Sequence, residues 1–211
     1  MAVVSLNGFK TNPGRNADHV AATTEAVGHL RRMGAQAFAF QSIAGGDVGT
    51  ISVVSNYADN AAHMSSLQQL QADAGWQDFF ARAVADASAT QVESSILSDI
   101  DPTFEASGRE MGAVSFTQWR TNPGRALDFM ASVETASAHI ERLGGAPRVM
   151  QSLIGAHPMS VLTSIAFADL DAYGEFTDKA QTDEQFMTFW AEATLNPSAT
   201  LLRTGLGVTI A

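Results

Sequence analysis

The sequence predicts an α+β protein made of two copies of one βαββαβ unit. The segment Thr11–Arg15 (TNPGR) returns unchanged 110 residues later as Thr121–Arg125, and further identities continue at that offset without a gap. Within each copy, short β-branched segments alternate with segments whose apolar residues recur every three or four positions. A period this long lies outside the range of solenoid repeats, so the chain is interpreted as a duplicated domain.

Each copy begins with a predicted strand that ends at a sharp corner. The segments Val3–Phe9 and Ala113–Trp119 are rich in β-branched and aromatic residues, and each runs into an Asn-Pro-Gly-Arg sequence. Proline lacks a backbone donor and glycine tolerates positive φ, so the strand ends there. Alternatively, Asn12 caps a helix that has Pro13 at its first position. Both readings predict a strand-to-helix corner.

The helix after the corner is clearest in the second copy. Its apolar stripe consists of Phe129, Val133, Ala136, Ile140 and Leu143. The first copy has a weaker stripe through Val20, Val27 and Leu30. Gly34 and Gly144 stand where a C-terminal cap is expected, each two residues after an arginine whose charge suits a helix C-terminus.

A hairpin, a helix in two pieces and a last strand complete each copy. The predicted strands are Gln36–Ile43, Thr50–Tyr57 and Thr90–Leu97, and in the second copy Arg148–Ile154, Ser160–Phe167 and Thr200–Ile210. The predicted helical pieces lie near Ala61–Leu70 and Ala172–Lys179, and then from Asp73 and Asp183 onward. Thr182 with Gln185 three residues later resembles a capping box.

This element order is the ferredoxin-like split βαβ unit, whose antiparallel sheet carries its helices on one face. Two such sheets packed face to face, or closed into a barrel, cover the other face and protect the strand edges. We therefore predict a first repeat over residues 1–98, a linker over 99–112 and a second repeat over 113–211. The linker, Ser107 and Gly108 included, replaces what would otherwise be a two-fold dimer contact.

The composition argues against several classes of partner and site. With 12 Lys+Arg against 22 Asp+Glu, the formal net charge is −10, so nucleic acid and anionic membranes are not expected as partners. The absence of cysteine excludes disulfides, thiolate metal sites and thiol nucleophiles. The N-terminus lacks the pattern of a signal peptide and no apolar run approaches a membrane span, so we predict a cytoplasmic protein.

Three common catalytic motifs fail their context tests. The glycine-rich segment Gly45–Gly49 joins two strands, with no helix behind it and no Lys-Ser/Thr pair, so it is not a phosphate loop. The sequence contains no H-E-x-x-H zinc motif and no G-x-S-x-G elbow. We therefore expect no metal, and either cofactor-independent chemistry or binding alone.

The chain resembles the dimeric α+β barrel superfamily, fused in tandem within one chain. The resemblance rests on the strand, the Pro-Gly-Arg corner, the helix that ends at glycine, the hairpin and the Asp-led helix with its aromatic tract. The segments Asp169–Tyr173 and Asp183–Phe186 are similar to NIPSNAP-type and antibiotic-biosynthesis-monooxygenase-type members. The resemblance implies a pocket between sheet and helices or inside the barrel. The superfamily includes cofactor-free oxygenases, isomerases, haem enzymes and members without known activity.

The candidate proton-transfer groups are His29 and His139, which are in register in the two copies. An imidazole titrates near neutral pH and suits acid–base catalysis. The alternative reading gives each histidine a packing role, with a hydrogen bond to a backbone carbonyl between helix and sheet. The candidate substrate-binding residues are the polar or aromatic side chains Asn7, Arg15, Gln41, His63, Trp119, Arg125, Gln151 and Tyr173.

Haem is retained as a minor alternative. Haem-degrading members have an Asn on the first strand, where this chain has Asn7, and they have a His and a Trp on the second helix. His63 and Trp76 depart from that order and spacing, and Thr117 replaces Asn7 in the second copy.

Two functions remain open from the sequence. One is a cofactor-independent enzyme of the oxygenase, isomerase or cyclase type that acts on a small apolar or aromatic metabolite. The other is a non-catalytic ligand-binding or structural module. The chain is predicted to be a pseudo-dimer, with a further homodimer as an option.

Overall fold

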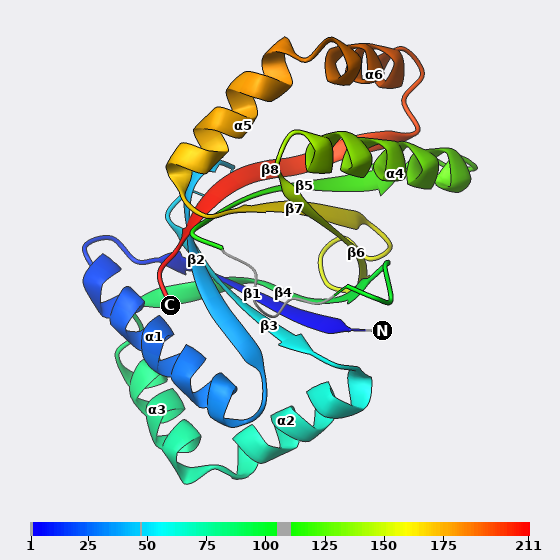
Figure 1. Ribbon diagram of the computed structural model, residues 1–211. Coiled ribbons are helices and arrows are strands. Elements are labelled where there is room, and N and C mark those ends of the chain that lie inside the picture. The colour runs from blue at the N-terminus through cyan, green and yellow to red at the C-terminus, as the bar shows by residue number, and fades with distance from the viewer. Residues whose placement is uncertain (1, 47, 105–110) are drawn as a thin grey trace.

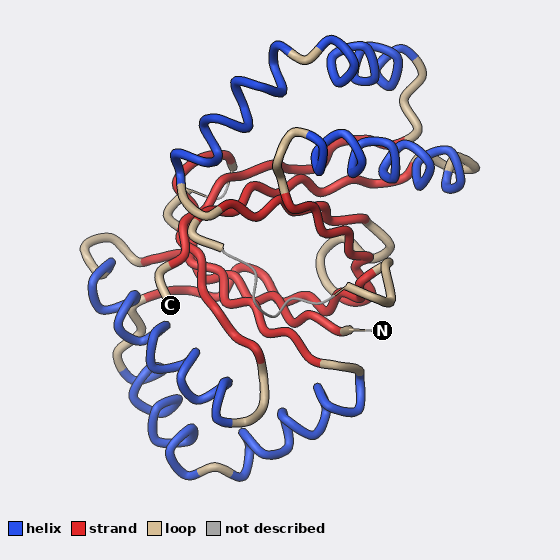
Figure 2. Tube along the Cα trace, in the orientation of Figure 1, coloured by secondary structure: helices blue, strands red, loops and turns tan. Residues whose placement is uncertain are grey.

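The computed structural model describes residues 2–46, 48–104 and 111–211, and it shows an eight-stranded barrel with helices on the outside (Figures 1 and 2). The first repeat comprises β1 (Val3–Thr11), α1 (Asn16–Arg32), β2 (Gln36–Gly45), β3 (Thr50–Tyr57), α2 (Asn60–Ala72), α3 (Ala74–Ala85) and β4 (Ala89–Asp99). The second comprises β5 (Ala113–Thr121), α4 (Ala126–Arg142), β6 (Ala146–Ile154), β7 (Val161–Phe167), α5 (Leu170–Thr182), α6 (Glu184–Leu195) and β8 (Ala199–Thr209).

The strands form one closed antiparallel barrel in the order β1-β3-β2-β8-β5-β7-β6-β4. The two repeats meet where β2 pairs with β8 and where β4 pairs with β6. Each strand and its counterpart lie half of the barrel apart, so a pseudo-two-fold axis runs along the barrel axis. The predicted α+β barrel of two βαββαβ repeats is confirmed.

Alternation along the strands separates a lumen from two outer helical layers. On β1, Val4 and Leu6 line the lumen, whereas Phe9 packs against the core cluster under the helices of the first repeat. Figure 1 shows α1–α3 on one side of the barrel and α4–α6 on the opposite side. In the described part of the chain, no helix has the length and apolar character needed to cross a membrane.

Two local predictions are corrected. Asn12 does not cap α1: the helix begins at Asn16 after a turn, and the Asn12 side chain donates to the Ala87 carbonyl at 2.8 Å, tying the corner to the start of β4. The Thr182–Gln185 capping box is also wrong, because Asp183 is the N-cap of α6 and accepts from the Phe186 N–H at 2.8 Å. A carboxylate accepts that bond more strongly than the neutral hydroxyl next to it.

The predicted helix ends at glycine are confirmed. Gly34 and Gly144 follow α1 and α4 with φ of 87° and 97°, a left-handed conformation that side chains with a Cβ adopt at a cost. Of the predicted linker, Ser107 and Gly108 lie outside the described residues.

Candidate functional site

A cavity of about 550 Å³ lies between the sheet of the second repeat and its three helices. We call it the second-repeat cavity. Its floor comes from β5, β6, β7 and β8, and its walls come from α4, α5 and α6. Its aromatic lining consists of Phe116, Trp119, Phe129, Phe176, Phe186, Phe189 and Trp190. The remaining lining residues are aliphatic, proline, serine or threonine, and none of the described lining residues is ionisable.

The same space is filled in the first repeat. Val27 on α1 and Val53 on β3 are 1% and 6% exposed and belong to one core cluster. Their counterparts, Ser137 and Thr163, line the second-repeat cavity instead. A serine is shorter than a valine, and a threonine puts a hydroxyl where the first repeat has a methyl group. The structure thus has a cavity in the second repeat at a position where the first repeat places core side chains.

The tryptophans span the cavity from floor to wall. Trp119 on β5 stacks against Trp190 on α6, with ring centroids 6.2 Å apart and planes 28° from parallel. Trp119 also lies 6.4 Å from the Phe129 ring of α4. Aromatic rings offset in this way bind planar apolar molecules through their faces.

One polar spot interrupts the apolar floor. The hydroxyls of Thr117 and Thr163 hydrogen-bond to each other, and Trp119 Nε1 donates to Thr117 Oγ1 at 3.0 Å. Two hydroxyls carry two protons, and their mutual bond uses one of them. The other proton is available either to the Thr117 carbonyl, 3.4 Å from Thr163 Oγ1, or to a ligand. The spot therefore suits a neutral acceptor such as a ketone oxygen.

A second, more open cavity of about 370 Å³ adjoins the first between α5 and α6 and shares Thr117, Phe176 and Trp190 with it. Tyr173 and Met187 line it. The Tyr173 ring packs edge-on against Phe167, with centroids 5.4 Å apart. Of the predicted site residues, Trp119 and Tyr173 are therefore the two that line these cavities.

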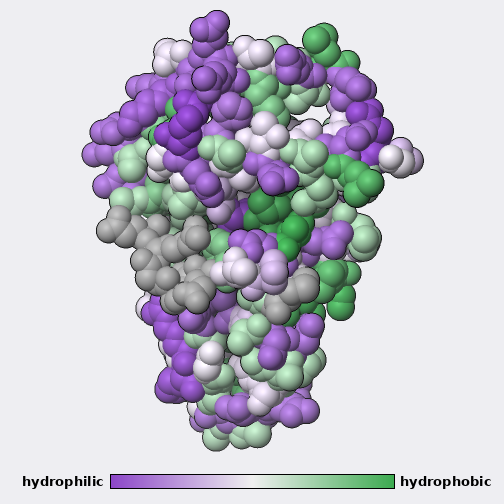
Figure 3. Space-filling view, turned by 45° about the vertical axis from the view of Figure 1, so that its right-hand side comes forward, coloured by the Kyte–Doolittle hydropathy of each residue, from purple (hydrophilic) through white to green (hydrophobic). Residues whose placement is uncertain are grey.

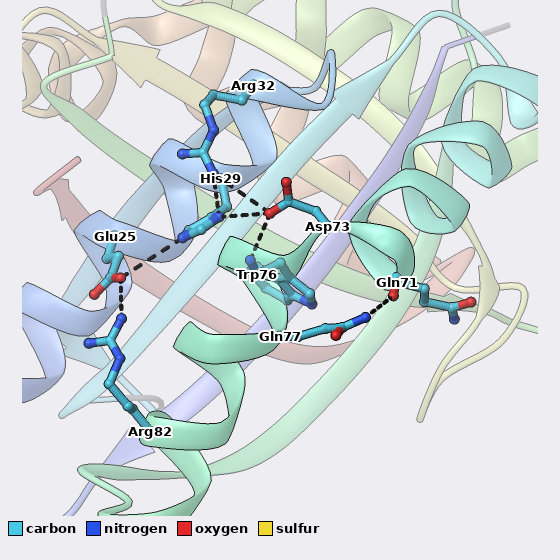
Figure 4. Close-up of polar contacts among 8 residues, drawn as sticks. All are labelled: Glu25, His29, Arg32, Gln71, Asp73, Trp76, Gln77 and Arg82. Carbon is cyan, nitrogen blue, oxygen red and sulfur yellow. Dashed lines mark hydrogen bonds and ion pairs between the residues drawn. The ribbon is translucent and has the colours of Figure 1, made fainter.

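His29 lies in a helix–helix seam, outside the lining of these cavities (Figure 4). It is 6% exposed, packs edge-on against Trp76, and its Nδ1 accepts from an Arg32 Nη at 2.5 Å. Its Nδ1 is also 3.7 Å from Asp73 Oδ1, at the N-terminus of α3.

His139 has an equivalent position between α4 and α6. Its ring lies 5.9 Å and 5.7 Å from Phe186 and Phe189, so it stands behind two aromatic side chains of the cavity wall. The proton-transfer roles of His29 and His139 stay predictions.

The remaining predicted binding residues also lie outside the lining of these cavities. Arg15 forms ion pairs with Asp18 and Asp86, which raise its pKa, and Arg125 bonds Asp128 and Asn196. Asn7 Nδ2 donates to Ser5 Oγ at 3.1 Å, and Gln41 Nε2 donates to Asn16 Oδ1 at 3.1 Å. Gln151 is half-buried on β6.

His63 occupies a buried polar position on α2. It is 2% exposed, and its ring lies 4.7 Å from that of Tyr57. Burial lowers its pKa, because a charged imidazole loses hydration there. Its Nδ1 and the Ser66 hydroxyl have no hydrogen-bond partner among the described residues. The second-repeat counterparts of the pair are Tyr173 and Phe176, so the repeats have diverged at this position.

The barrel lumen holds two ion pairs that the sequence reasoning missed. Arg148 binds Asp99 at 2.7 and 2.8 Å, and the two side chains are 9% and 1% exposed. Arg203 binds Glu93 through two bonds of 2.7 Å. The lumen cavity between them is about 120 Å³. Glu93 and Arg203 occupy the same position of the two repeats. The sequence therefore did contain a signal for this ion pair, namely opposite charges at one repeat position.

Haem does not fit the second-repeat cavity. An axial ligand to haem iron is a His, Cys, Met or Tyr, and among the described lining residues only Tyr173 and Met187 of the outer cavity are of those types. No described lining residue of either cavity carries a positive charge for the haem carboxylates. Among the described residues, no group of three His, Asp or Glu side chains is placed to hold a metal ion.

Comparison with known proteins supports the fold. Residues 4–101 match the NIPSNAP family model. The chain is similar to a candidate monooxygenase from Fusobacterium nucleatum subsp. nucleatum, at 14% identity, with 98% of this chain and 92% of that chain covered and a TM-score of 0.70. It is similar to an anthrone oxidase-like protein at 12% identity, with 98% and 91% covered and a TM-score of 0.63.

A heme-binding protein from Thermus thermophilus is similar at 9% identity, with 99% of this chain and 90% of that chain covered and a TM-score of 0.55. No curated protein sequence matches the chain significantly. At these identities the likeness shows a shared fold, and the cavity must be judged on its own residues.

Proposed function

As a dimeric α+β barrel whose first repeat matches the NIPSNAP family model, this chain is, we propose, a binding protein for small apolar or aromatic molecules. The ligand occupies the second-repeat cavity. The observation that carries the proposal is a 550 Å³ space with an aromatic lining in one repeat, at a position that the other repeat fills with core side chains. Ligand cavities of this kind span about 300–1,000 Å³.

The lining determines the chemical class. Because none of the described residues that line the second-repeat cavity is ionisable, a charged ligand would lose hydration without gaining a partner. A neutral planar molecule lies against the stacked Trp119–Trp190 pair and directs a carbonyl oxygen at the Thr117–Thr163 hydroxyls. A ligand that buries about 200 Å² of apolar surface gains about 5 kcal/mol at 25 cal/mol/Å². That free energy corresponds to a Kd of about 0.2 mM before the cost of association and the hydrogen bond are counted.

The test is quenching of tryptophan fluorescence by anthrone, a neutral three-ring ketone. Trp76→Phe removes the indole outside the cavity and installs the residue found at the second-repeat counterpart, Phe186. In that background anthrone should quench the two remaining tryptophans with saturation. Ala136→Phe, which fills the cavity from α4, should abolish the quenching. Ala138→Phe is the matched control, because it places the same ring on an exposed position of the same helix. Equal binding in both variants would reject the site.

Oxygenation of the bound ligand is the second candidate, and the Thr117–Thr163 hydroxyl pair is the feature that favours it. A carbonyl held there fixes the ring system while O₂ oxidises the opposite methylene carbon. For anthrone the reaction consumes one O₂ and yields anthraquinone and water. Anthraquinone formation above the rate without protein, lost in Ala136→Phe and kept in Ala138→Phe, supports an enzyme. Saturable binding without this excess supports a binding module.

A further inference from the structure

Three contacts tie α3 to the rest of the first repeat. At its N-terminal end, Asp73 lies beside His29 and Arg32 of α1. Farther along the helix, Arg82 forms an ion pair with Glu25 of α1 at 2.6 Å (Figure 4). At the C-terminal end, the Asp86 carboxylate accepts two bonds of 2.9 Å from Arg15 at the strand-to-helix corner. These three contacts hold α3 along its whole length.

Among the described residues of the second repeat, the first of these contacts is stronger than in the first repeat, and the other two are lost or weakened. Arg142 binds Asp183 through bonds of 2.6 and 2.8 Å, which anchors the N-terminal end of α6. The counterparts of Glu25 and Arg82 are Thr135 and Glu192, which cannot form an ion pair. Instead, the Thr135 hydroxyl donates to the Ala131 carbonyl of its own helix at 2.9 Å.

The C-terminal anchor of α6 is weakened as well. The counterpart of Asp86 is Asn196, which accepts one bond of 2.9 Å from Arg125. A neutral amide is a weaker acceptor than a carboxylate for an arginine. One end of α6 is therefore held by a two-bond ion pair, whereas the arginine contact at the other end is a single hydrogen bond to a neutral amide, next to the bond of 2.9 Å that Asn122 Nδ2 donates to the Pro197 carbonyl just after the helix.

The weakly held part of α6 is the part that closes the second-repeat cavity. Phe189, Trp190, Ala193 and Thr194 line the cavity from this side. Trp190 is 37% exposed, and Leu201, at the start of β8, is 47% exposed although it lines the cavity too. In the space-filling view of Figure 3, hydrophobic side chains reach the surface in small groups separated by hydrophilic ones. The mouth of the cavity is thus near the C-terminal end of α6.

We infer that α6 is the movable wall of the second-repeat cavity, hinged at Asp183 and opening at its C-terminal half to admit the ligand. This inference rests on the proposed binding function. In the first repeat, the Glu25–Arg82 and Arg15–Asp86 ion pairs hold α3 against its core, and we call them the latch. The second repeat lacks these ion pairs, which permits exchange of a ligand. Each surface ion pair shifts the equilibrium between the open and closed positions of the helix by up to about fivefold. The ion pairs therefore set the rate of opening and do not lock the cavity.

The experiment restores the latch in the second repeat. Thr135→Glu with Glu192→Arg copies the Glu25–Arg82 pair, and Thr135→Arg alone pairs with the native Glu192 in the opposite polarity. Both variants raise the net charge by one unit. Glu192→Gln raises it equally without creating a pair and is the matched control. None of these positions lines the cavity.

Two readouts separate the inference from the proposed function. In the Trp76→Phe background, stopped-flow quenching by anthrone should show association slowed about two- to fivefold in both latched variants and unchanged in Glu192→Gln. Without any ligand, amide hydrogen exchange in the C-terminal half of α6 should slow by a similar factor, and wild-type α6 should exchange faster than α3.

Failure of anthrone to bind the wild type would count against the proposed function, and the exchange rates alone would then decide whether α6 opens. Exchange in wild-type α6 as slow as in α3, or no slowing in either latched variant, would overturn the inference. Equal slowing in Glu192→Gln would also overturn it, because the effect would then come from net charge.

Discussion

The ion pair between Glu93 and Arg203 allows a quantitative test of how the two repeats recognise each other. These residues are counterparts in the duplicated chain, and they meet in the barrel lumen through two bonds of 2.7 Å. In a symmetric dimer of either repeat, the same position would bring two glutamates or two arginines together. Duplication within one chain allowed the position to diverge into opposite charges, which favours pairing of the first repeat with the second.

Reversal of one charge recreates the symmetric conflict. The side chains of Glu93 and Arg203 are 15% and 23% exposed, so the pair is mostly desolvated. Removal of one partner from a buried pair costs about 3–5 kcal/mol. Since some solvent reaches this pair, we expect Glu93→Arg or Arg203→Glu to lower the free energy of unfolding by about 3 kcal/mol. For a chain of this length, that is about 6–12 °C in Tm.

The assay is urea unfolding, with the m-value checked for two-state behaviour. The double variant Glu93→Arg with Arg203→Glu should regain stability to within about 1 kcal/mol of wild type, because the pair is rebuilt with reversed polarity. Glu175→Arg at the exposed Lys179–Glu175 pair, whose side chains are 60% and 75% exposed, should change stability by less than about 1 kcal/mol. Single reversals that cost less than about 1 kcal/mol, or a double variant no better than either single one, would refute the reasoning.

Three further predictions concern the second repeat. Thr163→Val installs the residue of the first repeat and should weaken anthrone binding about fivefold through loss of one hydrogen bond. Binding of anthracene, which lacks the ketone, should be unaffected, and equal loss for both molecules would show a packing effect. His139→Phe should leave anthrone binding in place and, if the predicted proton transfer operates, abolish turnover; unchanged turnover would remove that role. Arg142 lowers the pKa of Asp183 from 3.8 to about 2, so this contact stabilises the fold above pH 3.8 and is lost as the pH falls toward 2. Acid unfolding of Asp183→Asn should lack that component, and an identical pH profile would contradict the assignment.

Most of the fold could be predicted because its signals are local. The offset of the TNPGR segment, the alternating strands and the glycines after α1 and α4 each depend on neighbouring residues. The corner was harder, because an asparagine at position 12 suits both a helix cap and a tie to a distant loop. The structure shows the tie, a bond to the Ala87 carbonyl across 75 residues of chain.

The candidate site could be predicted only in part. Trp119 and Tyr173 do line cavities, since aromatic residues beside an apolar stripe concentrate there. The paired histidines attracted the catalytic prediction because both copies retain them. That retention equally suits the seam between the first and last helices of each repeat, where the structure places His29 and His139. Repetition in the sequence indicates a shared role without saying whether that role is chemical or structural.

The sequence by itself determined that the chain is a duplicated βαββαβ unit, because periodicity and a constant offset are properties of the chain alone. Only the tertiary structure decided that the second repeat is hollow and the first is packed. The volume of a cavity is a small difference between side chains contributed by seven separate elements, and no single segment records it. The structure alone also decided that Glu93 meets Arg203, because residues 110 positions apart come into contact only when the strands close around the pseudo-two-fold axis.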